Sequence, residues 1–326
     1  MNLHEDNDAF SELVAAAAGA IGLPEVYVEK DYWVTKALKY LSESIYVDDV
    51  VFKGGTSLSK AYRLIDRFSE DIDLAVFSEG KGDSARKKLL KAVEKVVSEN
   101  LVNLKGDERE SKGSKFRKTV YQYPRSIENN NFGQASPELL IEINAFTHPE
   151  PFEQRELRTF IAEMLGDQGK DELINQFGLE SFSINVLSVK RTLIEKLLGI
   201  IKDSYHEDPV IKISGRIRHF YDICLILREE EYKAFIGTDE FSSLCEQCID
   251  DERAGNFDGS VYLDHPLAEA PLFAKFKDWR PSLEATYNGI FSELVYGDLP
   301  SMDEVADTLN LLEGAVSHQN TASTTL

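Results

Sequence analysis

The sequence predicts a mixed α/β protein: a small mixed sheet, preceded by a helical segment and followed by a mostly helical region. Between residues 45 and 146, short apolar or β-branched runs alternate with amphipathic helical patterns, and after residue 150 helical patterns predominate. The 326 residues are 42% apolar and 29% charged, which is typical of a globular protein large enough for more than one domain. We therefore expect N-terminal helices packed on the core (1–44), an α/β core (45–150), a mostly helical domain (151–315) and a disordered tail (316–326).

The individual elements follow from periodicity. Apolar residues recur at helical spacing over 8–22, 25–43 and 84–100, and after the glycine pair at 54–55. A β-branched run ends at that glycine pair, and further runs at 71–77, 116–123 and 138–146 predict strands. Beyond residue 150 we expect one strand at 181–188 and helices over 154–165, 188–203, 214–229, 239–250, 280–295 and 302–314.

Charge and cysteine content restrict the classes of partner and compartment. The formal net charge of −21 means that the protein's overall field repels polyanions, so nucleic-acid binding would need a local basic patch. Three cysteines, Cys224, Cys245 and Cys248, are too few for a disulfide framework, and a reducing cytoplasm is expected. The apolar run at 13–23 has acidic rather than basic residues before it and is short for a membrane span, so we interpret it as a buried helix face.

A glycine pair, Gly54-Gly55, lies between a predicted buried strand and an amphipathic helix that Thr56 or Ser57 can cap. Glycine allows a sharp turn and a close approach to a ligand, and the N–H groups at a helix N-terminus favour an anion. A phosphate would suit this turn. A tight strand-to-helix connection without a ligand is the alternative interpretation of the glycines alone.

Two aspartates, Asp71 and Asp73, follow within the next strand pattern. Residues i and i+2 of a strand share a face, so both carboxylates leave the sheet together. Adjacent carboxylates repel unless a cation joins them, and hard ions such as Mg²⁺ or Mn²⁺ take oxygen ligands and bridge phosphates. Glu142, an acid inside an apolar strand, is expected on a neighbouring strand facing the same way, as a third ligand. Solvated strand-end acids are the alternative.

These features occur together in a known pattern. The stretches "EKDYWVTKAL", "FKGGTSLSKAY", "RFSEDIDL", "LSVKRTLIEKLLGI" and "RIRHFYDICLI" resemble, in order, the motifs of the AbiEii/AbiGii nucleotidyltransferase toxin family. That family is a branch of the DNA polymerase β-like nucleotidyltransferase superfamily. The resemblance extends over residues 25–315 and is most specific at the glycine pair and the Asp-x-Asp motif.

The resemblance implies roles for individual residues. Gly54, Gly55 and Thr56 or Ser57 would hold the nucleotide phosphates, with Lys53 as a local helper. Asp71 and Asp73 would bind Mg²⁺ or Mn²⁺, and Glu142 matches the superfamily's third acid less directly. Lys196 would match a lysine that contacts the triphosphate, with Lys190 as a rival, and Asp222 would match an aspartate needed for transfer, either as a base or in another role. An ion pair between helices is the alternative for Lys196 and Asp222.

The implied function is metal-dependent transfer of a nucleoside monophosphate from an NTP to an acceptor, with release of pyrophosphate. The family consists of toxins of bacterial toxin–antitoxin and phage-defence systems, so a cognate antitoxin is an expected partner and a tRNA 3′ end an expected acceptor. A protein or small-molecule acceptor, or a nucleotide-binding module without catalysis, are the alternatives.

A local basic region is compatible with an RNA acceptor, and a solvated basic face without a ligand is the alternative. Basic residues outnumber acidic ones between residues 81 and 118, and Lys87, Lys91 and Lys95 recur every four residues on a predicted helix. Tyr121 and Tyr123 follow and are candidates for base stacking. The further basic residues of this patch are Lys115, Arg117 and Lys118.

Overall fold

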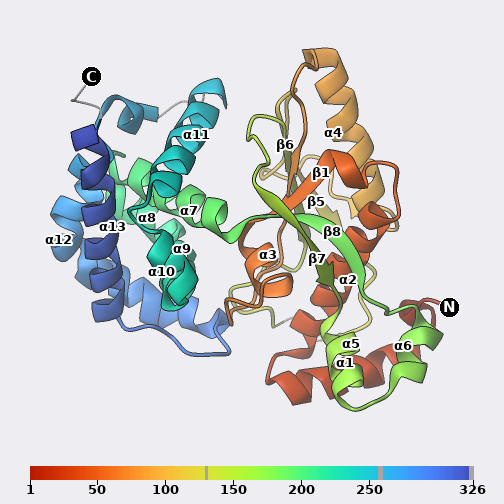
Figure 1. Ribbon diagram of the computed structural model, residues 1–326. Coiled ribbons are helices and arrows are strands. Elements are labelled where there is room, and N and C mark those ends of the chain that lie inside the picture. Colours follow the sequence, from red (N-terminus) through yellow and green to blue (C-terminus); the bar gives the residue numbers. More distant parts are fainter. Residues whose placement is uncertain (129–130, 256–259, 323–326) are drawn as a thin grey trace. The chain divides into compact units, whose positions relative to one another are not determined.

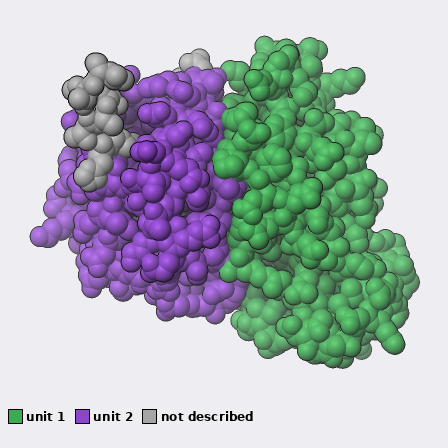
Figure 2. All heavy atoms as spheres, viewed as in Figure 1, with its two compact units in different colours: residues 1–63, 68–187 green, residues 64–67, 188–326 purple. Residues whose placement is uncertain are grey.

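The computed structural model describes residues 1–128, 131–255 and 260–322, and its helices and strands have the mixed α/β composition that the sequence predicts (Figure 1). The chain forms two compact units. The first contains residues 1–63 and 68–187, and the second contains residues 64–67 and 188–326 (Figure 2). Each unit is described by itself below.

The first unit contains a mixed sheet and six α-helices within the described part of the chain. The helices are α1 (Asn7–Ile21), α2 (Glu25–Ser42), α3 (Gly54–Lys60), α4 (Asp83–Val97), α5 (Phe160–Asp167) and α6 (Asp171–Phe177). The strands are β1 (Val50–Lys53), β2 (Ile72–Val76), β3 (Val102–Asn103), β4 (Ser111–Lys112), β5 (Phe116–Gln122), β6 (Leu139–Asn144), β7 (Phe152–Leu157) and β8 (Phe182–Leu187).

The strand order is β3-β5-β6-β2-β1-β8-β7, with β4 paired to β5. The central pairs β2/β6 and β1/β8 are parallel, whereas β1/β2, β5/β6 and β7/β8 are antiparallel. The central strands are short apolar runs such as Val50-Val51-Phe52, all at most 1% exposed, which is the pattern of strands covered on both faces. The glycine turn directly follows β1, and the Asp-x-Asp motif begins one residue before the adjacent strand β2.

The two faces of the sheet differ. On one face, Arg117 of β5 is 6% exposed and donates from Nε to Glu94 of α4 at 2.7 Å. Leu74 and Ile143, which share this face by register and strand alternation, are completely buried. The opposite face carries the partly exposed charged residues that form the candidate site.

Three consecutive charged residues of α2 are buried and organise their surroundings. The Glu29 carboxylate accepts hydrogen bonds from the backbone N–H groups of Ser126 and Ile127. Lys30 donates to the Ser136 carbonyl oxygen at 2.6 Å. Asp31 pairs with Lys60, the last residue of α3, and accepts a hydrogen bond from the Phe160 N–H at 2.9 Å. The N-terminal helical segment is thus bonded directly to the helix that follows the glycine turn.

The structure differs from the sequence prediction at residues 151–187. A single helix was expected over 154–165, but this region forms strand β7 and then α5. Pairing along the whole length of β8, from Phe152 with Leu187 to Leu157 with Phe182, outweighs the local helical pattern. As a result the first compact unit extends to Leu187, rather than to residue 150 as expected for the core.

The second unit is helical within its described residues. Its α-helices are α7 (Val189–Ser204), α8 (Pro209–Gly215), α9 (Ile217–Arg228), α10 (Glu230–Phe235), α11 (Asp239–Gly255), α12 (Pro271–Thr286) and α13 (Met302–Ala322). Short turns of other helix types lie at Ser260–Asp264, Leu267–Glu269, Tyr287–Phe291 and Ser292–Leu294, and in the first unit at Leu3–Glu5 and Val47–Asp49. Residues 316–322, expected to belong to a disordered tail, continue α13, and residues 323–326 lie outside the described residues.

No single helix of the described chain has the length and apolar character needed to span a membrane, although α1 and α2 together, bent by 110°, satisfy a test of length and composition.

Candidate active site

The glycine turn and the second aspartate are in direct contact. Gly54 has φ +84°, a backbone conformation that residues with a side chain rarely adopt. A Cβ atom built on Gly54 would lie 2.2 Å from Asp73 Oδ2 and 3.2 Å from Asp73 Cβ. Position 54 therefore needs glycine for two reasons: its backbone conformation and the carboxylate packed against it.

The need for glycine at position 54 can be tested by experiment. Gly54→Ala should lower the nucleotide transfer that the sequence resemblance implies by about a hundredfold, because Asp73 must move and a misplacement of about 1 Å costs that much in a catalytic site. Gly106 has the same φ, +84°, but a Cβ atom added to Gly106 would meet nothing within 4 Å, so Gly106→Ala carries only the backbone strain. Equal activity in the two variants would show that neither the backbone conformation of Gly54 nor its contact with Asp73 matters for function.

The hydroxyl groups after the glycines brace the turn. Thr56 Oγ1 donates to the Asp71 carbonyl oxygen at 2.6 Å, and Ser57 Oγ donates to the Gly54 carbonyl oxygen at 2.9 Å. Both side chains are at most 1% exposed. Thr56 thus connects the turn to the first aspartate, and any contribution of Thr56 or Ser57 to a phosphate site would come from backbone N–H groups.

The predicted relation between Asp73 and Glu142 is confirmed. Strand β6 lies beside β2 with Asp73 opposite Glu142, and both side chains are partly exposed while Leu74 and Ile143 are buried. Asp71 directly precedes β2, and its charge, like that of Asp73, acts on Lys118 of β5. On the other side of β2, Lys53 of β1 is opposite Asp73.

Lys118 of β5 completes this set of charges. It is opposite Glu142 in the strand register, and its Nζ lies 2.5 Å from Glu142 Oε1. Burial would lower the pKa of Lys118, but the hydrogen bond to Glu142 and the charges of Glu142, Asp71 and Asp73 outweigh it, and the pKa is raised. Lys118 was predicted as part of an RNA-binding patch, whereas the structure places it beside the carboxylates.

The fit of these residues to a divalent cation rests on the aspartate pair. Asp71 and Asp73 offer carboxylate oxygens close to one another in the chain, and Gly54 leaves room for the second carboxylate. Among the described residues, no three His, Cys, Asp or Glu side chains are grouped closely enough to hold a metal ion. The two aspartates therefore suit an ion that takes its other ligands from phosphate and water, with Glu142 held by Lys118.

In the second unit, Lys196 and Asp222 form an ion pair between two helices. In the sequence analysis, such a pair is the alternative to separate catalytic roles. Lys196 Nζ of α7 lies 2.7 Å from Asp222 Oδ2 of α9. Arg67 binds the same carboxylate through two hydrogen bonds, Nε to Oδ1 at 2.7 Å and Nη2 to Oδ2 at 2.8 Å. Asp222 is completely buried, and Lys196 and Arg67 are 6% and 2% exposed.

The surroundings of Asp222 do not suit a general base. Burial would raise the pKa of Asp222, but Arg67 and Lys196 outweigh it through their charges and hydrogen bonds, and the pKa lies well below its usual range. The neighbouring His219 also has its pKa lowered, by burial and by the charges of Lys196 and Arg216. Lys190, the rival lysine, pairs with Glu240 at 2.8 Å instead.

Arg67 belongs to a four-residue segment that is bonded firmly within the second unit. Asp66 accepts hydrogen bonds at its carbonyl oxygen from the N–H groups of Tyr296 and Gly297, at 2.9 and 3.2 Å. The Asp66 N–H donates to Tyr221 Oη at 3.2 Å, and Arg67 forms a β-bridge with Val295. Arg67 is not singled out in the sequence analysis, because its partner Asp222 is 155 residues away. The only local signal is its place in the motif "RFSED".

The predicted basic patch is only partly exposed. Lys87, Lys91 and Lys95 are exposed along α4, as expected. Arg117 is a correction, because it is buried against Glu94. Tyr121 and Tyr123 are also unavailable for base stacking, at 6% and 4% exposed.

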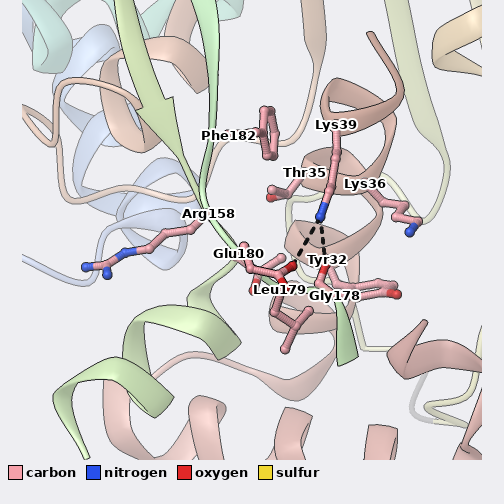
Figure 3. Close-up of a pocket in the computed structure, with 10 residues that line it drawn as sticks. Tyr32, Thr35, Lys36, Lys39, Arg158, Gly178, Leu179, Glu180 and Phe182 are labelled. Atoms are coloured by element: carbon pink, nitrogen blue, oxygen red, sulfur yellow. Dashed lines mark hydrogen bonds and ion pairs between the residues drawn. The ribbon is translucent and has the colours of Figure 1, made fainter. Parts of the chain in front are cut away.

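A separate pocket of the first unit contains none of the predicted site residues. It lies between Tyr32 and Lys39 of α2 and the segment around Gly178 and Glu180 (Figure 3). Lys39 Nζ donates to the Gly178 carbonyl oxygen at 2.9 Å and lies 3.6 Å from Glu180 Oε2. Of the other charged residues that line it, Lys36 donates to Asn2 Oδ1 and Arg158 Nε lies 3.6 Å from Glu163 Oε1.

Comparison with known proteins identifies a family. A family model described as the nucleotidyl transferase AbiEii toxin of a type IV toxin–antitoxin system matches residues 36–308. Among solved structures, MenT4, a nucleotidyltransferase toxin from Mycobacterium tuberculosis, is 15% identical, with a TM-score of 0.44 over 94% of this chain and 98% of that one. No curated protein matches the sequence.

Proposed function

We propose that this chain, which belongs to the AbiEii nucleotidyltransferase toxin family, transfers a nucleoside monophosphate from an NTP to an RNA acceptor in a reaction that needs a divalent cation. Family membership makes it a nucleotidyltransferase toxin of a type IV toxin–antitoxin system, and an antitoxin is its expected partner. The acceptor, the metal dependence, the cytoplasmic location and a role in phage defence are part of the proposal.

The observation that carries the proposal is the contact between the glycine turn and the aspartate pair. Gly54 is the residue through which the turn approaches Asp73, and Thr56 bonds to the backbone of Asp71. A phosphate held by the backbone of Gly54 and Gly55 would therefore lie beside two carboxylates, an arrangement that is repulsive without a cation. Mg²⁺ or Mn²⁺, when bound, would supply the charge neutralisation that phosphoryl transfer requires.

The reaction then assigns roles to the chain's own residues. Asp71 and Asp73 would hold the ion, and the backbone of Gly54, Gly55 and Thr56, with Lys53, would orient the triphosphate. An acceptor hydroxyl oxygen would form a new bond to the α-phosphorus while the bond from that phosphorus to the α–β bridging oxygen breaks, the hydroxyl proton passes to water, and pyrophosphate leaves. Lys196 would contact the triphosphate, as the family resemblance implies. To Asp222 we assign the positioning of Lys196 and Arg67 rather than proton abstraction.

An RNA acceptor is favoured by the basic stripe on α4, formed by Lys87, Lys91 and Lys95. Within the described part of the chain, none of these three exposed side chains forms an ion pair, although the protein carries a net charge of −21. Cationic side chains at fixed spacing along a helix suit the phosphates of a nucleic-acid backbone. A tRNA 3′ end is our first candidate, and a protein acceptor is the alternative.

The proposal is tested by supplying NTPs labelled at the α-phosphate or at the γ-phosphate, together with total RNA or lysate protein. Label from the α-position should appear in RNA, and label from the γ-position should not. Removing divalent ions with a chelator should abolish the transfer, and adding Mg²⁺ or Mn²⁺ should restore it.

Three outcomes would count against parts of this proposal. Transfer that persists in the chelator would contradict the metal dependence. Label in protein but not in RNA would contradict the acceptor and leave the reaction type standing. Incorporation of the γ-phosphate would show a kinase-type reaction and contradict nucleotide transfer itself.

A further inference from the structure

Four charged residues form a single row across the candidate site. Strand register places Lys53 opposite Asp73, Asp73 opposite Glu142, and Glu142 opposite Lys118. Adjacent strands are about 4.8 Å apart, so each residue is the nearest neighbour of the next on this face. The order of charges along the row is positive, negative, negative, positive, with Asp71 two residues before Asp73 in the chain.

The row is built into the sheet and is not an accident of long surface side chains. Its members are partly exposed, and on the two central strands of the row the next residues, Leu74 after Asp73 and Ile143 after Glu142, are completely buried. The Lys118 and Glu142 side chains are 29% and 30% exposed, and their charged atoms are 2.5 Å apart. Lys118 therefore holds its charge two strands away from Asp73.

We propose that Lys118 is the built-in counter-cation of the carboxylate row and competes with the divalent cation of the proposed reaction for it. While Lys118 pairs with Glu142, its charge offsets the repulsion among Glu142, Asp73 and Asp71 and holds Glu142 away from the ion. The positive charge of Lys118 then repels the divalent cation and weakens its binding. This inference rests on the proposed function, because it takes Asp71 and Asp73 as the ligands of the ion.

The same hairpin provides a matched control. Lys112 of β4 also pairs with a carboxylate, with its Nζ 2.7 Å from Glu110 Oε1, and is 38% exposed. Neither Lys112 nor Glu110 belongs to the row. Replacing Lys112 changes the net charge of the protein by the same amount as replacing Lys118, so it controls for the overall field.

The test measures binding of Mn²⁺ alone, by electron paramagnetic resonance at low ionic strength, without nucleotide. Lys118→Met should tighten Mn²⁺ binding by about fivefold or more, because a unit charge about 9 Å from a divalent ion is removed. Lys118→Arg, which retains the charge, and Lys112→Met should bind Mn²⁺ as the unaltered protein does. Lys118→Gln provides a second neutral variant if Lys118→Met does not fold.

Unaltered or weaker Mn²⁺ binding in the folded neutral variants would overturn the competition between Lys118 and the ion. That result would leave the proposed function intact if label transfer still needs a divalent ion. Failure of the unaltered protein to bind Mn²⁺ without nucleotide would also overturn this inference, because Lys118 would then have no ion to compete with, whereas the proposed function is decided separately by the metal dependence of label transfer.

Discussion

Replacing Asp71 by asparagine is expected to lower nucleotide transfer by about a thousandfold, the scale seen when a group that stabilises charge in a transition state is removed. Asparagine keeps the size of the side chain and loses the negative charge that would hold the cation. The same change should leave the free energy of unfolding within about 0.5 kcal/mol of its original value or raise it slightly, since it removes one of two neighbouring like charges.

The measurement is initial-rate transfer of α-label together with urea unfolding followed by circular dichroism. Asp48→Asn is the matched control, because Asp48 is an exposed aspartate of the same unit outside the carboxylate row. It should change neither transfer nor stability. Full transfer in Asp71→Asn would remove Asp71 from the machinery, and a large loss of stability would mean that the residue has a structural role.

Replacing Asp222 by alanine is expected to lower the free energy of unfolding by about 3–5 kcal/mol, because a buried pair broken on one side leaves uncompensated charge. Here the remaining charges are those of Arg67 and Lys196, both at most 6% exposed. The hydrogen bonds that hold Arg67, and with it the segment 64–67, would be lost at the same time.

Two comparisons test this explanation by urea unfolding. Asp203→Ala removes the partner of Arg216, whose side chain is 40% exposed, and should cost no more than about 1 kcal/mol. The triple variant Arg67→Met, Lys196→Met and Asp222→Leu removes all three charges and should recover most of the stability lost in Asp222→Ala. A loss below about 1 kcal/mol in Asp222→Ala would contradict a stabilising role for the ion pairs of Asp222 with Arg67 and Lys196.

The same ion pairs set a direction for the dependence of stability on pH. Because the pKa of Asp222 is lower in the folded protein than in the unfolded chain, its contribution is fully present above the unfolded pKa of about 4. That contribution is lost as the pH falls toward the lower folded value, so the difference in stability between the unaltered protein and Asp222→Ala should shrink on acidification.

The candidate site illustrates how far local sequence reasoning reaches. The glycine pair and the Asp-x-Asp motif are close in sequence, and the alternation of strand residues is enough to place Asp71 and Asp73 on one face. Glu142 could be placed as well, since a charged residue in an apolar strand must face the more polar side of the sheet. Register confirms that it is opposite Asp73.

The same alternation shows why Lys118 was misinterpreted. Arg117 and Lys118 are adjacent basic residues, and composition treats them alike. In β5 they point to opposite faces, so Arg117 is buried against Glu94 and Lys118 meets Glu142. Only the position of β5 beside β6 tells which of the two reaches the carboxylates.

By itself, the sequence determined the α/β class, the family and the identity of the glycine turn and its two aspartates, because these depend on patterns within a few residues of one another. The tertiary structure decided what depends on distant partners. Pairing with β8 made residues 152–157 a strand, and a partner 155 residues away explained Arg67. It also made Asp222 a buried ion-pair partner and brought Lys118 to Glu142, since long-range pairing and register are set by packing over the whole unit.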